Sequence, residues 1–284
     1  MALLAVVQLQ NRKEVKIIFV IGAVINTSVP GINEIIEQRN KKKLLEIARM
    51  QIDYGAKMLA INCGTRFDSE SDDIEWMFRV IQDEIEIPLC IDSPNPEAHK
   101  AGLKVHRYGR PMVNSITAEK SRIETIMPLA ARYNAMVVAI LHDEDGMPKD
   151  VTGRLRVVPK IRKAAKEYGV KPEDIFLDCM IFPLSVNHDN GQVYLNTLKA
   201  VKEKYPEFKT ICGLNNISYG LPQPELLNQT FLTMCAALGQ EAVFIETTKL
   251  TRATFKAIQT LLGKDNYSMN YLKAYRNKEL GIFY

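Results

Sequence analysis

The feature that most constrains the fold of this chain is a regular alternation between short apolar segments and longer amphipathic segments. Short apolar runs are typical of buried strands, and amphipathic runs between them are typical of helices that cover a parallel sheet. The apolar segments lie at 16–22, 58–62, 88–92, 111–114, 136–142, 175–178, 210–213 and 242–245. The helical patterns lie at 32–54, 70–83, 96–103, 118–133, 151–168, 191–204, 224–238 and 252–262. Eight such pairs predict an α/β fold, the (β/α)8 TIM barrel.

Both ends of the chain extend beyond this alternation. We expect residues 1–15 to form an N-terminal extension, residues 16–263 the barrel, and residues 264–284 a C-terminal helical extension packed on the barrel. In the last segment, large side chains recur at helical spacing, at Tyr267, Tyr271, Leu272 and Tyr275. Such a stripe is typical of a helix that covers the bottom of a barrel or contacts a second subunit.

Length, charge and cysteine content exclude several classes of protein. With 284 residues, of which 46% are hydrophobic, the chain can bury one large core without a second domain. Its 37 basic and 33 acidic residues are scattered, so we expect no nucleic-acid partner. No apolar run reaches the length of a membrane span, so we expect no membrane partner. Five cysteines without a Cys-x-x-Cys spacing are typical of reduced core residues in a cytoplasmic protein.

Polar side chains follow the apolar segments at the points where the predicted strands end. In a parallel barrel these ends meet at one rim, which is where TIM barrels carry their active sites. The candidate site residues are Asn26, Asn62, Asp92, Asn114, Asp178 and Asn216. Amides and carboxylates with few cations suit a flat, neutral ring that forms hydrogen bonds better than they suit a phosphate. For each residue taken singly, the alternative is that it caps the following helix.

Other familiar sites are not indicated. The first strand is followed by no Gly-x-Gly-x-x-Gly, and the chain has no phosphate-binding loop motif. Residues 142–145, His-Asp-Glu-Asp, offer ligands for a divalent cation, but a solvated loop that ends at Gly146 is favoured, and we expect no metal. Ser93 and Cys90 have no base nearby in the sequence, so no nucleophile is predicted.

A series of short motifs, in order from about Ile21 to Glu246, resembles a known family. The motifs are Ile25-Asn26-Thr27, Ala60-Ile61-Asn62-Cys63-Gly64, Cys90-Ile91-Asp92-Ser93, Val113-Asn114-Ser115, Gly146-Met147-Pro148-Lys149-Asp150, Leu177-Asp178, Gly213-Leu214-Asn215-Asn216-Ile217-Ser218 and Asn228-Gln229-Thr230-Phe231-Leu232. Together they resemble the methyltetrahydrofolate:corrinoid protein methyltransferases, which are pterin-binding (β/α)8 barrels. Within that family, the resemblance points to the folate-side methyltransferase of a corrinoid-dependent demethylase or acetogenic system.

The resemblance implies roles for the candidate site residues. It implies that Asp92, Asn114 and Asp178 bind the pterin ring, and that Asp178 also orients an ordered water. It places Asn216 beside the ring nitrogen that carries the methyl group, as a hydrogen-bond donor in catalysis. Asn26 and Asn62 match motifs that line the floor and mouth of the barrel.

The resemblance also implies substrates and partners. The substrate is tetrahydrofolate or methyltetrahydrofolate, and the corrinoid (cobalamin) is carried by a separate corrinoid protein. We expect the corrinoid protein to face a partly apolar rim that includes Phe67, Phe182, Leu184 and Leu221. Members of the family are commonly homodimers. Two departures affect substrate orientation or docking: Ala23-Val24 replaces a charged pair, and Pro224 stands where some relatives have arginine.

Three other functions are compatible with a barrel of this kind. Dihydropteroate synthase shares the barrel and the pterin pocket, although its opening motif and its late basic motif are not found in this sequence. A non-catalytic folate-binding or corrinoid-docking scaffold would need the same pocket without the chemistry. A metal-dependent lyase would use His142 and Asp143.

Overall fold

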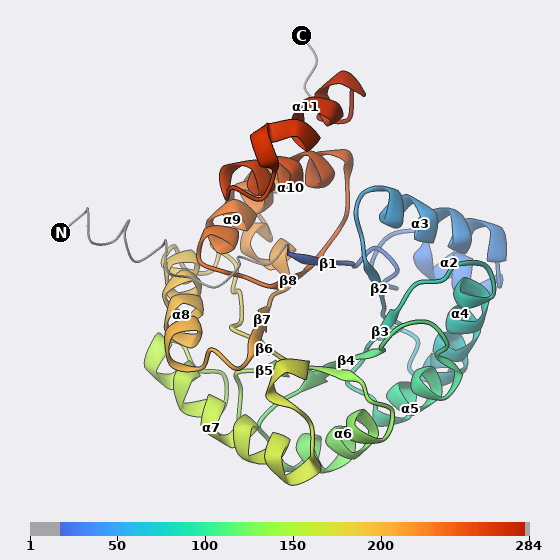
Figure 1. Ribbon diagram of the computed structural model, residues 1–284. Coiled ribbons are helices and arrows are strands. Elements are labelled where there is room, and N and C mark those ends of the chain that lie inside the picture. Colours follow the sequence, from blue (N-terminus) through green and yellow to red (C-terminus); the bar gives the residue numbers. More distant parts are fainter. Residues whose placement is uncertain (1–17, 282–284) are drawn as a thin grey trace.

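The computed structural model describes residues 18–281, and within them eight parallel strands form a ring with helices outside it (Figure 1). The strands are β1 (Phe19–Gly22), β2 (Met58–Ile61), β3 (Leu89–Asp92), β4 (Met112–Ile116), β5 (Met136–Ile140), β6 (Ile175–Asp178), β7 (Lys209–Ile211) and β8 (Ala242–Ile245). The ladder runs without reordering from β7 down to β1 and then to β8. The predicted TIM barrel is therefore confirmed.

The helices follow the strands in sequence and cover the outside of the ring (Figure 1). They are α2 (Ile32–Glu37), α3 (Lys41–Asp53), α4 (Glu70–Glu84), α5 (Pro96–Val105), α6 (Lys120–Arg132), α7 (Val151–Tyr168), α8 (Asn190–Lys204), α9 (Pro224–Ala237), α10 (Lys249–Leu261) and α11 (Met269–Arg276). Three short 3-10 turns, η1 (Pro172–Asp174), η2 (Leu214–Ser218) and η3 (Asn266–Ser268), complete the described structure. Among these helices, none is long and apolar enough to cross a bilayer.

One predicted helix, 32–54, is wrong as a single element. The chain breaks it into α2 and α3 at Arg39, whose φ of 50° lies in the left-handed region and interrupts the helical ladder. Asn40 then caps α3, because its side-chain oxygen accepts the backbone N–H of Lys43 at 3.2 Å. Apolar spacing continues through the break, so the periodicity alone did not reveal it.

Alternation along the strands produces two apolar layers. One cluster fills the inside of the ring, with Ile21, Met58, Cys90, Met112, Phe176 and Phe244 among its members. The neighbouring strand residues, such as Ile61, Ile91, Val113 and Leu177, belong to the larger cluster between the strands and the helices. Since successive strand residues face opposite sides, the position two residues after an inner residue also faces inward. This rule fixes which side chains reach the mouth of the barrel.

The ring closes less regularly between β7 and β8 than elsewhere. Here the described residues form one parallel bridge, Gly213 to Phe244, and the backbone N–H of Phe244 donates to the Cys212 carbonyl oxygen at 2.8 Å. This bridge lies at the C-terminal ends of the two strands, since Gly213 follows β7 and Phe244 is near the end of β8. The cavity described below opens at this seam.

The two predicted extensions remain predictions. Residues 1–15 lie outside the described part of the chain. At the other end, α11 packs on α10, where Tyr271 contacts the small cluster of Ala253, Ala274 and Leu280. Tyr267 and Tyr275 are 95% and 64% exposed, so this part of the aromatic stripe is free for contact with a second subunit.

Gly102 allows α5 to approach β3, the strand that carries Asp92. A Cβ atom at this position would lie 2.6 Å from Cγ1 of Ile91 and 3.2 Å from Cζ of Phe78. Gly102→Ala gains about 1 kcal/mol of helix propensity, but overpacking costs about 1–3 kcal/mol. We expect a net loss in the free energy of unfolding, measured with urea. In an Ile91→Ala background, Gly102→Ala should lower the free energy of unfolding by less. A Gly102→Ala variant more stable than wild type would contradict this explanation.

Candidate active site

The predicted site residues lie at the C-terminal ends of the strands. Asp92, Asn114 and Asp178 are the inner-facing residues that follow Cys90, Met112 and Phe176 by two positions. Asn62 comes directly after β2, and Asn216 lies in the turn η2 after β7. The parallel strand order places all five on one rim of the barrel, as predicted. Their functional roles remain predictions.

Three of these residues form one hydrogen-bonded unit. The Nδ2 group of Asn62 donates to Oδ2 of Asp92 at 3.1 Å, and Nδ2 of Asn114 donates to Oδ1 of Asp92 at 2.9 Å. Oδ1 of Asn62 also accepts the backbone N–H of Gly64 at 2.9 Å. Asn62 is therefore held from both ends and orients Asp92, whereas the side-chain oxygen of Asn114 has no hydrogen-bond partner among residues 18–281.

Glu70, the first residue of α4, stands behind Asp92 and was missed by the sequence analysis. It is 4% exposed, and its carboxylate accepts the Ser93 hydroxyl at 2.6 Å and Nδ2 of Asn95 at 3.1 Å. The Ser93 hydroxyl is thus committed to Glu70. Nothing in the local sequence links residue 70 to residues 93 and 95, because the barrel brings α4 beside the β3 loop.

The environment of Asp92 shifts its ionisation. Burial raises the pKa of Asp92 to about 6, and the negative charge of Glu70 contributes in the same direction. The hydrogen bond from Asn62 opposes the rise, because it stabilises the charged form. A ligand that donates further N–H groups would stabilise the carboxylate in the same way.

Asp178 occupies the far side of the mouth from this unit. Its Oδ1 accepts the backbone N–H of Met180 at 2.8 Å, and burial raises the pKa of Asp178 to about 6. The positive charge of Arg154 acts against that rise. Arg154, on α7, is 1% exposed and donates to the Cys179 carbonyl oxygen at 2.8 Å. The sequence analysis missed Arg154, because its residue pattern is that of any helical arginine.

Asn216 projects from η2 with an exposed side chain. Gly213, two positions after the inner residue Ile211, lies directly beside it. A Cβ atom on Gly213 would lie 3.2 Å from Nδ2 of Asn216. The missing side chain at Gly213 therefore leaves room for the Asn216 amide at the mouth.

Asn26 is placed differently from the other candidates. Its backbone bridges to Asn62, and its side-chain oxygen accepts the N–H and the hydroxyl of Ser28 at 2.9 and 2.7 Å. The oxygen is thus committed to its own loop. This geometry favours a role in shaping the rim over direct contact with a ring.

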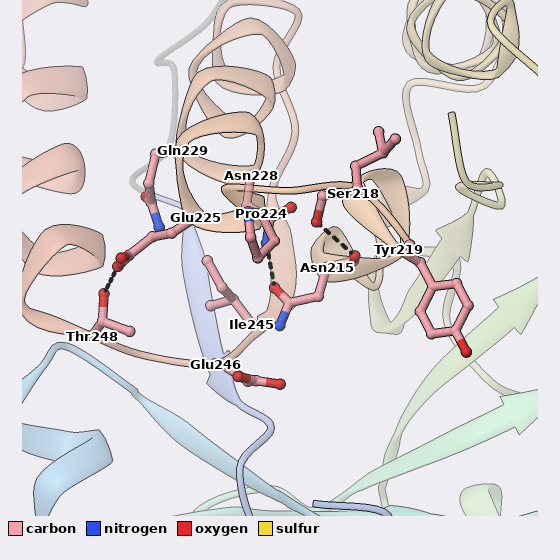
Figure 2. Close-up of a pocket in the computed structure, with 12 residues that line it drawn as sticks. Asn215, Ser218, Tyr219, Pro224, Glu225, Asn228, Gln229, Ile245, Glu246 and Thr248 are labelled. Atoms are coloured by element: carbon pink, nitrogen blue, oxygen red, sulfur yellow. Dashed lines mark hydrogen bonds between the residues drawn. The ribbon is translucent and has the colours of Figure 1, made fainter. Parts of the chain in front are cut away.

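A cavity of about 430 Å³ opens between η2, the start of α9, the end of β8 and the start of α10 (Figure 2). Asn215 and Glu246 line it. Glu246 was also missed by the sequence analysis, although a signal was present: it follows the inner residue Phe244 by two positions, just as Asp92 follows Cys90.

Comparison with known proteins places the chain in a family. The family of pterin binding enzymes matches residues 23–246. The chain is 30% identical over 265 residues to the methylcorrinoid:tetrahydrofolate methyltransferase of Eubacterium limosum, a match that covers 92% of this chain and 97% of that protein. The chain belongs to the pterin-binding enzymes. The family resemblance found in the sequence motifs is confirmed.

Two further groups of proteins resemble this pterin-binding enzyme. The methionine synthase of Mycobacterium leprae is 27% identical over 221 residues, which cover 74% of this chain and 18% of that protein. Among solved structures, Xanthomonas albilineans dihydropteroate synthase with 4-aminobenzoic acid superposes with a TM-score of 0.68 at 17% identity, over 89% of this chain and 95% of that one. At that identity the likeness supports the fold alone.

The loop at 142–145 of this pterin-binding enzyme is solvated at Glu144 and Asp145, as predicted, but not at Asp143. Asp143 is fully buried, and its carboxylate pairs with Lys160 at 3.0 Å and Arg156 at 3.7 Å. These charges lower the pKa of Asp143 although burial alone would raise it. Within residues 18–281, no cluster of three or more His, Cys, Asp or Glu side chains is arranged to hold a metal ion.

Arg154→Met tests how this pterin-binding enzyme sets the ionisation of Asp178. Removing the positive charge removes a stabiliser of the carboxylate, so we expect the pKa of Asp178 to rise further above its ordinary value. The carboxyl would then stay protonated to higher pH. A carbon NMR titration of the Asp178 carboxyl measures the shift. Arg156→Met, on the same helix but paired with Asp143 and Asp145, is the control and should leave the titration of Asp178 unchanged.

Proposed function

We propose that this protein transfers a methyl group between methyltetrahydrofolate and the cobalt of a corrinoid held by a partner protein. The observation that carries the proposal is the set of inner-facing side chains Asp92, Asn114 and Asp178 on one rim, with Asn216 beside them. The similarity to a methylcorrinoid:tetrahydrofolate methyltransferase over 92% of the chain supports the same activity. The protein would act as the folate-side methyltransferase of a corrinoid-dependent demethylase system.

The free hydrogen-bonding groups at the mouth are mostly acceptors. Oδ1 of Asn114 and the second oxygen of Asp178 have no hydrogen-bond partner among residues 18–281, and Asp92 accepts only amide groups. A reduced pterin presents an exocyclic amino group and ring N–H groups, which are donors. Binding would therefore stabilise both carboxylates, and folate affinity should weaken as the pH falls through about 6, where Asp92 and Asp178 protonate.

Methyl transfer requires that the ring nitrogen gain positive character before the carbon leaves it. In the folate-to-corrinoid direction, the N–CH3 bond breaks, the cobalt(I) pair of electrons forms the new Co–CH3 bond, and the nitrogen keeps its electron pair and gains a proton. We assign to Asn216 a hydrogen bond that strengthens as this charge develops. Asp178 would orient the ring and an ordered water that relays the proton. The reverse direction uses the same groups, and no protein nucleophile is needed.

The corrinoid protein would dock over the mouth of the barrel. Phe67, on the loop after β2, is 81% exposed, and the half-buried Phe182, Leu184 and Leu221 lie on the loops after β6 and β7. Exposed large apolar side chains of this kind are typical of interaction surfaces. We further propose a homodimer through the exposed Tyr267 and Tyr275 stripe, a cytoplasmic location, and no nucleic-acid or membrane partner.

Dihydropteroate synthase activity is the alternative that the fold similarity raises. That reaction releases diphosphate, which calls for cations near the pterin. The late basic motif that serves diphosphate chemistry in that family is not found in this sequence. Its absence favours methyl transfer.

The decisive assay mixes the purified protein, methyltetrahydrofolate and cob(I)alamin, and follows the absorbance change from cob(I)alamin to methylcobalamin. We expect transfer that depends on protein concentration. A parallel assay with a pterin diphosphate and 4-aminobenzoate should release no diphosphate. Folate binding without transfer would favour the docking scaffold, and diphosphate release would favour the synthase.

Asn216→Ala tests the activating hydrogen bond. Loss of one preorganised donor should lower the transfer rate by about 10²-fold or more, while the dissociation constant for methyltetrahydrofolate changes little. Asn196→Ala, on the exposed face of α8, is the matched control and should behave as wild type. A rate for Asn216→Ala close to that of wild type would remove this residue from the mechanism.

A further inference from the structure

The cavity between η2, α9 and the end of β8 has features of a second binding site. It lies over the seam between β7 and β8, whereas Asp92 and Asn114 lie on β3 and β4. Its walls come from η2, from the first turns of α9 and α10, and from the end of β8 (Figure 2). A group bound in this cavity would therefore lie beside η2 and Glu246, away from Asp92 and Asn114.

Two buried amide side chains in the cavity wall have oxygen atoms that accept no hydrogen bond from residues 18–281. Asn228 is 7% exposed, and its Nδ2 group donates to Oδ1 of Asn215 at 3.4 Å. Gln229 is 8% exposed, and its Nε2 group donates to the Thr251 hydroxyl at 3.1 Å. Within residues 18–281, neither side-chain oxygen of this pair has a hydrogen-bond partner. Buried polar atoms are nearly always paired, so these oxygens indicate a donor that comes from a ligand.

The charge of the cavity excludes an anionic ligand. Glu225 and Glu246 both line it, and no lysine or arginine among the described residues does so. The Glu225 carboxylate accepts the Thr248 hydroxyl at 2.5 Å, which places negative charge at the start of α10 (Figure 2). The glutamate tail of a folate would be repelled here, as would a diphosphate.

The cavity also offers an amide donor. Oδ1 of Asn215 is occupied by Asn228, while its Nδ2 group has no hydrogen-bond partner in the described part of the chain. An ammonium group would find acceptors but would leave this donor unpaired. A neutral primary amide both donates and accepts, so it complements the whole lining.

We propose that this cavity binds a primary-amide arm at the edge of the corrin ring and so sets the position of the cobalt over the methyl group. The inference rests on the proposed methyl transfer, because the corrinoid is its second substrate. Corrinoids carry acetamide and propionamide arms around the macrocycle, and a cavity of about 430 Å³ has room for one such arm. Glu246 and Asn228 would accept its N–H groups, and Asn215 would donate to its carbonyl oxygen.

Free corrinoids test the proposal. We would measure KM, kcat and the equilibrium dissociation constant with cobalamin and with its monocarboxylic acids, in which one propionamide is a carboxylate. For wild type, we expect at least one of these acids to bind about tenfold more weakly than cobalamin, as for one lost hydrogen bond. Glu246→Gln should reduce the difference in affinity between cobalamin and that acid, because it removes the repulsion between two carboxylates. Asn228→Leu should raise KM for cobalamin about tenfold without changing folate affinity.

Control variants and outcomes separate the inference from the proposed function. Glu203→Gln, exposed on α8, should keep the wild-type discrimination. The inference is overturned if wild type transfers methyl groups, binds every acid as tightly as cobalamin, and differs from no variant in these measurements. The cavity would then hold only solvent. If wild type neither transfers methyl groups nor binds cobalamin, the proposed function fails as well. Because Glu246 is exposed, Glu246→Gln remains informative even if Asn228→Leu does not fold.

Discussion

A desolvated carboxylate held between two amide groups organises the mouth of this barrel. Asp92 accepts N–H groups from Asn62 and Asn114, so three neighbouring strands are linked where their ladder ends. Burial and the nearby Glu70 raise the pKa of Asp92 to about 6, which means that the ionised form is costly in the folded protein. Such a cost is typical of sites where groups are arranged for binding and not for stability.

The rest of the fold supports this arrangement in layers. The inner apolar cluster fills the ring below the mouth, and the larger apolar cluster packs the helices against the strands. Arg154 and Glu70, buried on α7 and α4, hold the loops after β6 and β3 from behind. Beyond the ends of β7 and β8, by contrast, a cavity lies between η2 and the starts of α9 and α10. In the proposed reaction, the hydrogen-bonded part of the rim binds the pterin and the cavity binds an arm of the corrin ring.

Much of this could be predicted from the sequence, for identifiable reasons. The strands were found because each is a short apolar run, and Asp92, Asn114 and Asp178 were found because a polar residue ends each run. Glu246 carried the same signal and was overlooked. Glu70 and Arg154 could not be found, because their contacts join segments far apart in the chain. The break at Arg39 was missed because its left-handed backbone does not alter the spacing of apolar residues in the sequence.

The central claim is that groups from separate strands grip the pterin ring at this rim. A crystal structure of the protein with methyltetrahydrofolate tests it most directly. The account predicts ring N–H groups within hydrogen-bond distance of Asp92, Asn114 and Asp178, with the methyl-bearing nitrogen beside Asn216. A ring bound elsewhere, or bound at this rim without contact to either carboxylate, would contradict the account.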